Sequence, residues 1–261
     1  MQANEINKKS LDMKLKMLSL IFRYLSWADS IYKWKISKGN CPLCGESYFL
    51  SFRKDPFLTR CLKCKANITN LSLIPIIKEH TKGDYNKSVY ELSSYGSTLV
   101  FLISHFSKVV ASEYFPDRNF GELVDGILNQ DVQKLTFNDN SFDIITSNQV
   151  FEHVPDDIKG FSECFRVLSN GGAYIFTVPL YDIKKTIKIA SIINNEIVFE
   201  GTPEYHDSRL GGAKSAPVFY HYSVHDICDR VKSVGFSKVT LCEVDIVSIQ
   251  GKSQLVVYAL K

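Results

Sequence analysis

The chain has 261 residues, of which 45% are hydrophobic and 23% are charged, and its formal net charge is +3. This composition is ordinary for a globular protein and excludes an intrinsically disordered chain. It also excludes a membrane span, because no window approaches the roughly 20 uninterrupted apolar residues that a spanning helix needs. We therefore expect a cytoplasmic protein with one sizeable core and a small accessory module.

The N-terminal part, assigned to residues 1–36, contains a predicted helix over 11–34. Its apolar residues recur at steps of three and four, which is the helical period: Leu11, Leu15, Leu18, Phe22 and Leu25. Further apolar residues widen this stripe and indicate packing on two sides. A buried structural helix is therefore favoured over one that lies on a membrane surface.

Two Cys-x-x-Cys pairs, Cys41/Cys44 and Cys61/Cys64, follow with sixteen residues between them. This spacing is typical of a zinc ribbon, which we assign to residues 37–70. Four thiolate ligands leave no open position on the metal, so we expect a structural zinc ion. Lys65 stands where a glycine would ease the second turn. The other three of the seven cysteines are scattered, which favours a reducing compartment.

Positive charge is concentrated in residues 33–65, which carry eight basic side chains against two acidic ones. Such a module could contact an acidic partner such as RNA. Alternatively, its lysines offset the net negative charge of four thiolates around zinc, and we favour this second interpretation.

From about residue 85, short apolar runs alternate with helical stretches, a pattern that predicts a parallel α/β sheet. The expected strands are 88–92, 108–113, 126–129, 143–148, 173–178, 237–245 and 253–259. One helix should begin at Asp156 or Asp157 and end at 170–172, with Ile158, Phe161, Phe165 and Leu168 as its buried stripe. A second should open with a capping box over Ser223–Asp226 and end at Gly235.

Polar and small residues follow the expected strands at regular places. Glu91 ends the first strand and is followed by a small-residue turn that includes Ser93 and Gly96, where the backbone can approach a nucleotide. Glu113 comes 22 residues later at the tip of the second strand, where a carboxylate can accept both ribose hydroxyls. Asp131 follows the third strand and could accept a hydrogen bond from an adenine amino group.

The series over about 87–179 resembles the class I S-adenosylmethionine-dependent methyltransferases, in particular the type 11 group. The motifs that carry the resemblance occur in order and include 91–96, 112–115, 135–137, 141–143, 151–156, 166–168, 171–172 and 176–179. The turn departs from the family pattern, because Ser93, Tyr95 and Ser97 occupy the usual glycine positions.

The resemblance implies a Rossmann-like, seven-stranded methyltransferase fold over 71–261 with S-adenosylmethionine as cofactor. It implies cofactor contacts from Glu91, Ser93, Gly96, Glu113, Asp131 and Asn148. Methyl transfer to a hydroxyl or amine also needs a proton removed, and His153 is the candidate base at the cleft mouth. Packing against the following helix is the alternative role for His153.

Residues 180–222 form a predicted substrate lid, with ordinary surface-loop behaviour as the alternative. Its polar and aromatic residues are candidates for acceptor contacts: Tyr205, His206, Tyr220 and His221. Three functions stay open. We favour a methyltransferase that acts on a small molecule, sugar or glycan intermediate. The others are an RNA methyltransferase that uses the zinc ribbon for recognition, and a catalytically degenerate cofactor-binding protein.

Overall fold

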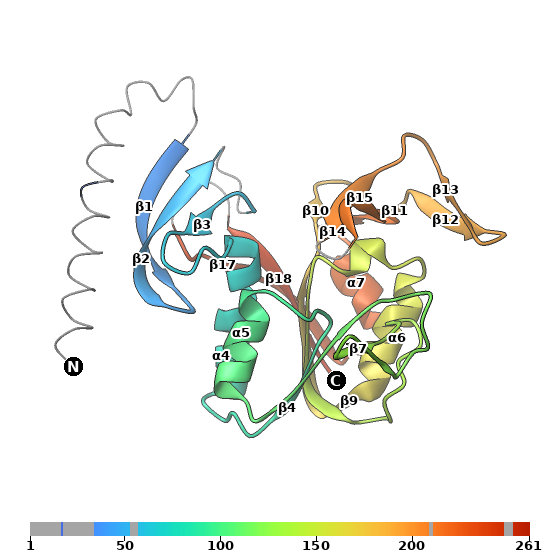
Figure 1. The fold of residues 1–261 in the computed structure, drawn as a ribbon, viewed down its shortest axis with the longest axis horizontal. Helices are drawn as coiled ribbons and strands as arrows, with labels where there is room; N and C mark the ends of the chain where they lie inside the picture. Colours follow the sequence, from blue (N-terminus) through green and yellow to red (C-terminus); the bar gives the residue numbers. More distant parts are fainter. Residues whose placement is uncertain (1–16, 18–33, 53–56, 209–210, 248–252) are drawn as a thin grey trace. The chain divides into compact units, whose positions relative to one another are not determined.

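A computed structural model describes residues 17, 34–52, 57–208, 211–247 and 253–261 (Figure 1). The helix predicted over 11–34 lies outside these residues, except for Met17 and Trp34. The chain forms two compact units. The first comprises the residues up to Ser72 together with Val244–Gln254, and the second comprises Leu73–Glu243 and Leu255–Lys261. The sequence predicts an uninterrupted domain over 71–261, whereas 244–254 belongs to the first unit.

The first unit is built on a small antiparallel sheet. Strands β1 (Trp34–Cys41) and β2 (Gly45–Phe52) form a hairpin, and β3 (Arg60–Cys61) pairs with β2. A short helix, α3 (Ile68–Leu71), follows. Gly39 lies against the 244–254 segment, since a Cβ there would come within 2.9 Å of both the Ile246 carbonyl oxygen and Val247 Cγ2.

The second unit contains an eight-stranded sheet in the order β17-β18-β9-β8-β4-β5-β7-β6. Its strands are β4 (Ser88–Glu91), β5 (Lys108–Glu113), β6 (Leu123–Val124), β7 (Ile127–Asn129), β8 (Phe142–Asn148), β9 (Leu168–Thr177), β17 (Lys238–Val244) and β18 (Gln254–Leu260). Pairs within β7-β5-β4-β8-β9 are parallel, and β18 runs antiparallel to β9. The seven predicted strands are present, and the two-residue β6 is the additional one.

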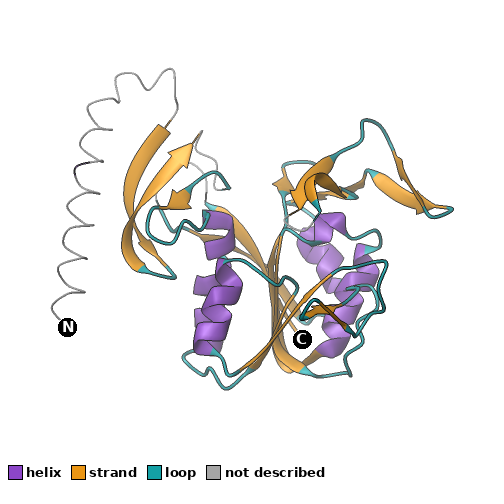
Figure 2. Cartoon of the chain, viewed as in Figure 1, coloured by secondary structure: helices purple, strands orange, loops and turns teal. Residues whose placement is uncertain are grey.

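Helices cover both faces of this sheet (Figures 1 and 2). Helices α4 (Leu73–Thr81) and α5 (Ser97–His105) lie on one face, and α6 (Asp157–Val167) and α7 (Ile227–Lys232) lie on the other. Because both faces are covered, the inner strands β8 and β9 are buried over most of their length, including polar residues such as Thr146 and Ser147. None of the described helices is both long and apolar enough to cross a membrane.

Helix α6 differs from its predicted burial pattern. Ile158 is exposed, Leu168 already belongs to β9, and the buried positions are Asp157, Gly160, Phe161, Cys164 and Val167. The cause is packing against a segment that the periodicity of α6 alone does not reveal. The Phe151 and Phe161 rings stack with centroids 4.3 Å apart. Gly160 makes room for this stack, because a Cβ there would lie 2.9 Å from Phe151 Cε1.

The start of α7 also differs from the predicted capping box. Ser223 Oγ accepts a hydrogen bond from the His225 amide at 3.0 Å. The Asp226 carboxylate instead accepts bonds from the Thr186 amide at 2.8 Å and from the Thr186 hydroxyl at 2.5 Å. Asp226 therefore fastens the segment over 180–222 to the start of α7.

The segment over 180–222 is built from short strands: β10 (Leu180–Tyr181), β11 (Ile187–Lys188), β12 (Ala190–Ile193), β13 (Glu196–Phe199), β14 (Tyr205–Ser208), β15 (Gly212–Pro217) and β16 (Tyr220–Ser223). Strands β10, β16 and β11 form one small sheet, while β12–β13 and β14–β15 form two hairpins. Tyr220, Tyr222 and Ser223 of β16 are buried. This segment is therefore partly a packed element of the second unit.

Candidate functional site

A cavity of about 120 Å³ lies where the carboxyl ends of the parallel strands meet. In the sheet, β5 and β7 lie on one side of β4, and β8 and β9 lie on the other side. The chain therefore changes direction across the sheet at β4. Parallel α/β sheets bind ligands at such a switch point. The lining includes residues that follow four strands: Leu92 after β4, Glu113 at the end of β5, Asp131 after β7 and His153 beyond β8.

Glu113 is held by the turn that departs from the family pattern. Its Oε1 accepts hydrogen bonds from the Ser94 amide at 2.7 Å, from Ser94 Oγ at 3.0 Å and from Ser93 Oγ at 3.3 Å. The two serine hydroxyls therefore add bonds to the carboxylate that glycines could not provide. Tyr95 is 38% exposed and is not among the described residues that line the cavity.

Asp131 lines the same cavity and shapes the loop after β7. Its Oδ1 accepts hydrogen bonds from the Gln133 amide at 2.8 Å and from Gln133 Nε2 at 3.1 Å. Gln133 Oε1 in turn accepts a bond from the Asp156 amide at 3.0 Å, which links this loop to the start of α6. The structure therefore brings the predicted ribose and adenine carboxylates to one hollow.

Four other predicted cofactor residues do not line this cavity. Glu91 is 1% exposed and accepts a short hydrogen bond from Thr146 Oγ1. Burial raises the pKa of Glu91 to about 8. Gly96 is the N-cap of α5 with φ +106°, a conformation that L side chains rarely adopt. Ser93 reaches the cavity only through its bond to Glu113.

Asn148 is occupied by structural contacts at the end of β8. Its Nδ2 donates to Thr98 Oγ1 at 2.8 Å, and its Oδ1 accepts from Thr177 Oγ1 at 2.9 Å. Asn148 thus ties α5 to the ends of β8 and β9. The structure places it outside the described lining of the cavity.

The far side of the cavity is formed after β8 by the short helix η2 (Phe151–His153). Residues 217–222 hold η2 in place. The Phe219 amide donates to the Glu152 carbonyl oxygen at 2.7 Å, and Tyr222 Oη donates to the Phe151 carbonyl oxygen at 3.1 Å. The Glu152 side chain is 0% exposed, and burial raises the pKa of its carboxyl to about 8.

His153 is fixed by its own bond to the same segment. Its Nδ1 lies 2.8 Å from the Pro217 carbonyl oxygen, so Nδ1 carries the proton and the lone pair is on Nε2. Burial lowers the pKa of His153 to about 4, so the imidazole is neutral at pH 7. His153, the predicted general base, therefore has a free lone pair at the cavity. Its low pKa means that it is a weak base.

The predicted acceptor residues of the 180–222 segment divide into two groups. His206 lies beside His153, with ring centroids 5.0 Å apart, and His221 Nε2 lies 2.8 Å from Glu204 Oε2. Tyr220 is buried, and its hydroxyl donates to the Pro155 carbonyl oxygen at 3.1 Å. Tyr205 is 40% exposed and packs on Phe199. His206 is therefore close to His153 of the cavity, His221 contacts Glu204 instead, and Tyr220 is part of the core.

Sequence reasoning did not single out Glu152, and it missed a buried ion pair behind it. Asp157 is 0% exposed and receives both Arg230 Nε and Arg230 Nη2 at 2.6 Å, as well as Tyr222 Oη at 3.1 Å. A bidentate pair of this kind fixes orientation. The Glu-His pair within the 151–156 motif could have drawn attention to Glu152. The burial of Glu152 could not be foreseen, because the segment that packs on it lies some 65 positions further along the chain.

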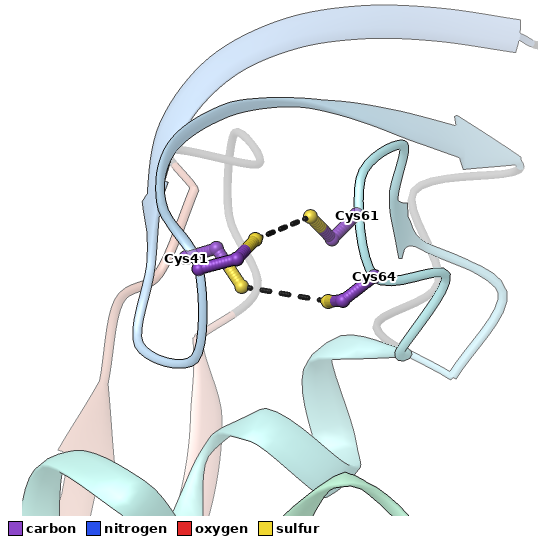
Figure 3. Close-up of side chains that lie close together, drawn as sticks. Cys41, Cys61 and Cys64 are labelled. Carbon is purple, nitrogen blue, oxygen red and sulfur yellow. Dashed lines mark hydrogen bonds between the residues drawn. The ribbon is translucent and has the colours of Figure 1, made fainter. Parts of the chain in front are cut away.

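The four predicted zinc ligands come together in the first unit (Figure 3). The sulfur atoms of Cys41, Cys44, Cys61 and Cys64 all lie within 4.8 Å of one another. Cys41 Sγ is 3.7 Å from Cys64 Sγ, and Cys44 Sγ is 3.6 Å from Cys61 Sγ. A zinc ion with bonds of about 2.3 Å separates tetrahedral thiolates by about 3.8 Å.

The turns of the cysteine cluster fit this role. Gly45 has φ +74° and Lys65 has φ +62°, so each Cys-x-x-Cys pair is followed by a left-handed residue. Burial and the adjacent thiols of Cys41 and Cys61 raise the pKa of Cys44 to about 12. Because thiolates are the metal-binding form, a cation is needed to hold this cluster deprotonated.

Comparison with protein families identifies one matching domain. Residues 91–176 match the model described as a methyltransferase domain. The chain contains a methyltransferase domain. The matched residues run from the end of β4 into β9 and include both carboxylates of the cavity. No curated protein matches the chain.

Solved structures similar to this chain include three bacterial proteins. An S-adenosylmethionine-dependent methyltransferase from Mesorhizobium loti is 18% identical, with a TM-score of 0.49 over 73% of this chain and 98% of that one. A methyltransferase from Aquifex aeolicus is 15% identical, with a TM-score of 0.46 over 74% and 91%. The 1,6-didemethyltoxoflavin-N1-methyltransferase of Burkholderia thailandensis is 11% identical, with a TM-score of 0.48 over 74% and 78%.

Proposed function

We propose that this methyltransferase binds S-adenosylmethionine at the carboxyl ends of β4, β5 and β7 and transfers its methyl group to a small molecule, sugar or glycan intermediate. The observation that carries the proposal is that Glu113 and Asp131, from successive strands, line one cavity with His153. Glu113 would accept the ribose hydroxyls, and Asp131 would accept the adenine amino group.

The size of the cavity indicates where the rest of the cofactor lies. At about 120 Å³ it is smaller than the roughly 300 Å³ at which ligand pockets begin. The donor must therefore extend along the turn at 93–96 toward the N-terminus of α5. Free amides at a helix start and small side chains allow such an approach.

The acceptor would enter from the side of His153 and the 180–222 segment. Methyl transfer is an in-line displacement, so the protein chiefly aligns the attacking atom with the methyl carbon. We propose that His153 acts as the general base and takes a proton from the substrate with its Nε2 lone pair. His206 and His221 would make further contacts with the substrate. A neutral imidazole whose Nδ1 proton is held by a carbonyl oxygen suits the role of a base.

Calorimetry with S-adenosylmethionine and S-adenosylhomocysteine tests the cofactor site. Micromolar binding by the wild type and its loss in Glu113→Ala are expected, because the ribose loses its carboxylate partner. Glu122→Gln is a matched control, since Glu122 contacts Asn119 at the surface away from the cavity. Absence of binding by the wild type would remove the enzyme proposal, and binding without turnover on any acceptor would favour a degenerate enzyme.

We further propose that the cysteine cluster holds a structural zinc ion. Four thiolates complete the coordination, so the ion would stabilise the first unit and take no part in methyl transfer. Cys64→Ser should abolish stoichiometric zinc, as measured by elemental analysis, and should expose β1–β3 to proteolysis. Cys228→Ser is the control, because Cys228 lies in the second unit. Full zinc retention in Cys64→Ser would contradict the proposal.

The contacts of the basic residues in the ribbon favour a small acceptor over RNA. Arg60 Nη1 donates to the Lys65 carbonyl oxygen at 3.1 Å, and Lys63 Nζ makes a short bond to the Glu46 carbonyl oxygen. Lys38 pairs with the Glu46 carboxylate at 3.5 Å. These side chains thus support the turns of the ribbon. Salt-sensitive RNA binding that disappears in an Arg53, Lys54 and Arg60 triple alanine variant would instead favour RNA as substrate.

A further inference from the structure

A buried carboxylate and two imidazoles meet beside the cavity. The ligand atoms of Glu152, His153 and His206 all lie within 4.8 Å of one another. Glu152 is 0% exposed, and neither of its carboxylate oxygens has a hydrogen-bond partner among the described residues. A buried carboxylate is costly when nothing compensates it, so a group of this kind calls for a cation or a proton.

We propose that Glu152, His153 and His206 bind a divalent first-row transition-metal ion. Two imidazoles and one carboxylate form the donor set of open zinc and non-haem iron sites. Three protein ligands leave coordination positions for other molecules, in contrast to the closed set of four thiolates in the first unit. The two sites therefore differ in both donor chemistry and accessibility.

His153 is prepared for this role by its hydrogen bond. With its Nδ1 proton on the Pro217 carbonyl, it directs the Nε2 lone pair toward Glu152, whose Oε1 lies 3.8 Å away. Metal-binding histidines commonly donate their other ring proton to a carbonyl or carboxylate, which fixes the ring and its tautomer. Ligands bound at about 2.1 Å lie roughly 3 Å or slightly more apart, so this pair needs only a small approach.

His206 completes the set from β14 and has its own supporting contacts. Its Nε2 lies 3.6 Å from Glu204 Oε1, while Glu204 Oε2 accepts a bond from His221 Nε2 at 2.8 Å. The His206 side chain is 37% exposed. An ion could therefore enter from the His206 side, whereas Glu152 closes the buried end of the site.

The role of such an ion rests on the proposed function. His153 also lines the cavity, so the ion would lie at the acceptor end. With the ion bound, His153 Nε2 would be a ligand and would no longer be available as the base. An acceptor hydroxyl bound to the ion would have a lowered pKa and would lose its proton to solvent. The resulting oxygen would attack the methyl carbon as the carbon–sulfur bond breaks and its electron pair returns to sulfur. This assigns an oxygen nucleophile as the acceptor class.

The test measures metal binding directly on the full chain with zinc in its cysteine cluster. Equilibrium dialysis against Co²⁺, followed by elemental analysis, counts cobalt and zinc per chain. The wild type should bind one cobalt ion in addition to zinc. Glu152→Gln and His206→Gln should each weaken cobalt binding at least tenfold, because each removes one of three ligands. His206→Gln alters a partly exposed side chain, so folding should be retained.

His225→Gln is the matched control, because His225 pairs with Asp182 at the surface and lies outside the cluster. It should bind cobalt like the wild type. No cobalt beyond the cysteine cluster in the wild type would overturn the proposal, as would unchanged binding in both ligand variants. Binding of S-adenosylhomocysteine by the same preparations is measured separately, so cobalt binding without it would sustain the metal site and defeat the proposed function.

Discussion

Single residues at the strand ends differ in how far the sequence reveals their roles. Glu113 and Asp131 were predictable, because the end of a strand can be read from a local pattern and parallel strands bring their ends together. Glu152 was not, because its burial depends on the Phe219 amide and the Tyr222 hydroxyl far along the chain. Asn148 also stands at the end of a strand, as the sequence predicts, but its side-chain amide is bonded to Thr98 and Thr177 and does not line the cavity.

The buried carboxyl of Glu91 should make stability depend on pH. Its pKa rises from 4.5 to about 8 on folding, chiefly through burial, so the folded state binds the extra proton. Its contribution to stability is present below about pH 4.5 and is lost as the pH rises toward 8. Glu91→Gln should therefore gain stability relative to the wild type between pH 5 and 8.

Thermal unfolding of both chains across this pH range measures the effect. Gln keeps a carbonyl oxygen to accept the bond from Thr146, so packing is preserved. Glu79→Gln, a change for which no such gain is expected, controls for altered net charge. A difference in melting temperature between Glu91→Gln and the wild type that stays constant over this range would contradict the prediction.

At the scale of elements, the strands of the sheet were easier to predict than what packs on them. The run 173–178 has apolar residues at five of its six positions and is buried on both faces, which marks it as an inner strand without knowledge of its neighbours. The buried face of α6 was misassigned because Phe151 and Arg230 decide it, through the stack on Phe161 and the pair with Asp157. The small sheets of 180–222 were missed, since strands of two to six residues leave too short a pattern.

The turn after the second Cys-x-x-Cys pair contains a residue that costs stability. Lys65 has φ +62°, a region that favours glycine, whereas Gly45 occupies the equivalent place after the first pair. Lys65→Gly should stabilise the cluster by about 0.5–1 kcal/mol, because it relieves this strain. The Arg60 bond to its carbonyl oxygen is unaffected.

Zinc release to a chelator, followed with a colorimetric dye, should be slower in Lys65→Gly than in the wild type. Lys65→Ala removes the same side chain but keeps a Cβ at the strained position, so it should show no such gain. Equal slowing in both variants would mean that the lysine side chain, and not the backbone conformation, limits stability.

At the scale of the whole molecule, the chain leaves the first unit after Ser72, returns to it at Val244 and leaves it again after Gln254. Val244–Gln254 joins β17 to β18 of the sheet yet belongs to the unit that holds the cysteines. No local pattern separates 244–254 from the strands on either side, which is why a continuous domain was predicted. The Gly39 contact with Ile246 and Val247 shows the packing that decides the assignment.

Removal of residues 1–72 should therefore damage the remaining chain. Ile246 and Val247 are 7% and 5% exposed in the complete protein, and deletion would uncover them. We expect aggregation of the shortened chain in size-exclusion chromatography, because exposed apolar patches promote association. The same deletion with Ile246→Ser and Val247→Ser should be more soluble. Monodisperse behaviour of the unmodified deletion would contradict this expectation.

Because the first unit is made of two separate segments of the chain, its parts are synthesised at different times. Strands β1–β3 and the four cysteines leave the ribosome early, since domains fold from the N-terminus as they emerge. The part of that unit contributed by Val244–Gln254 emerges only after nearly all of the sheet has been made. The nascent chain therefore carries an incomplete first unit through most of translation, and completion of this unit waits until β17 has been made.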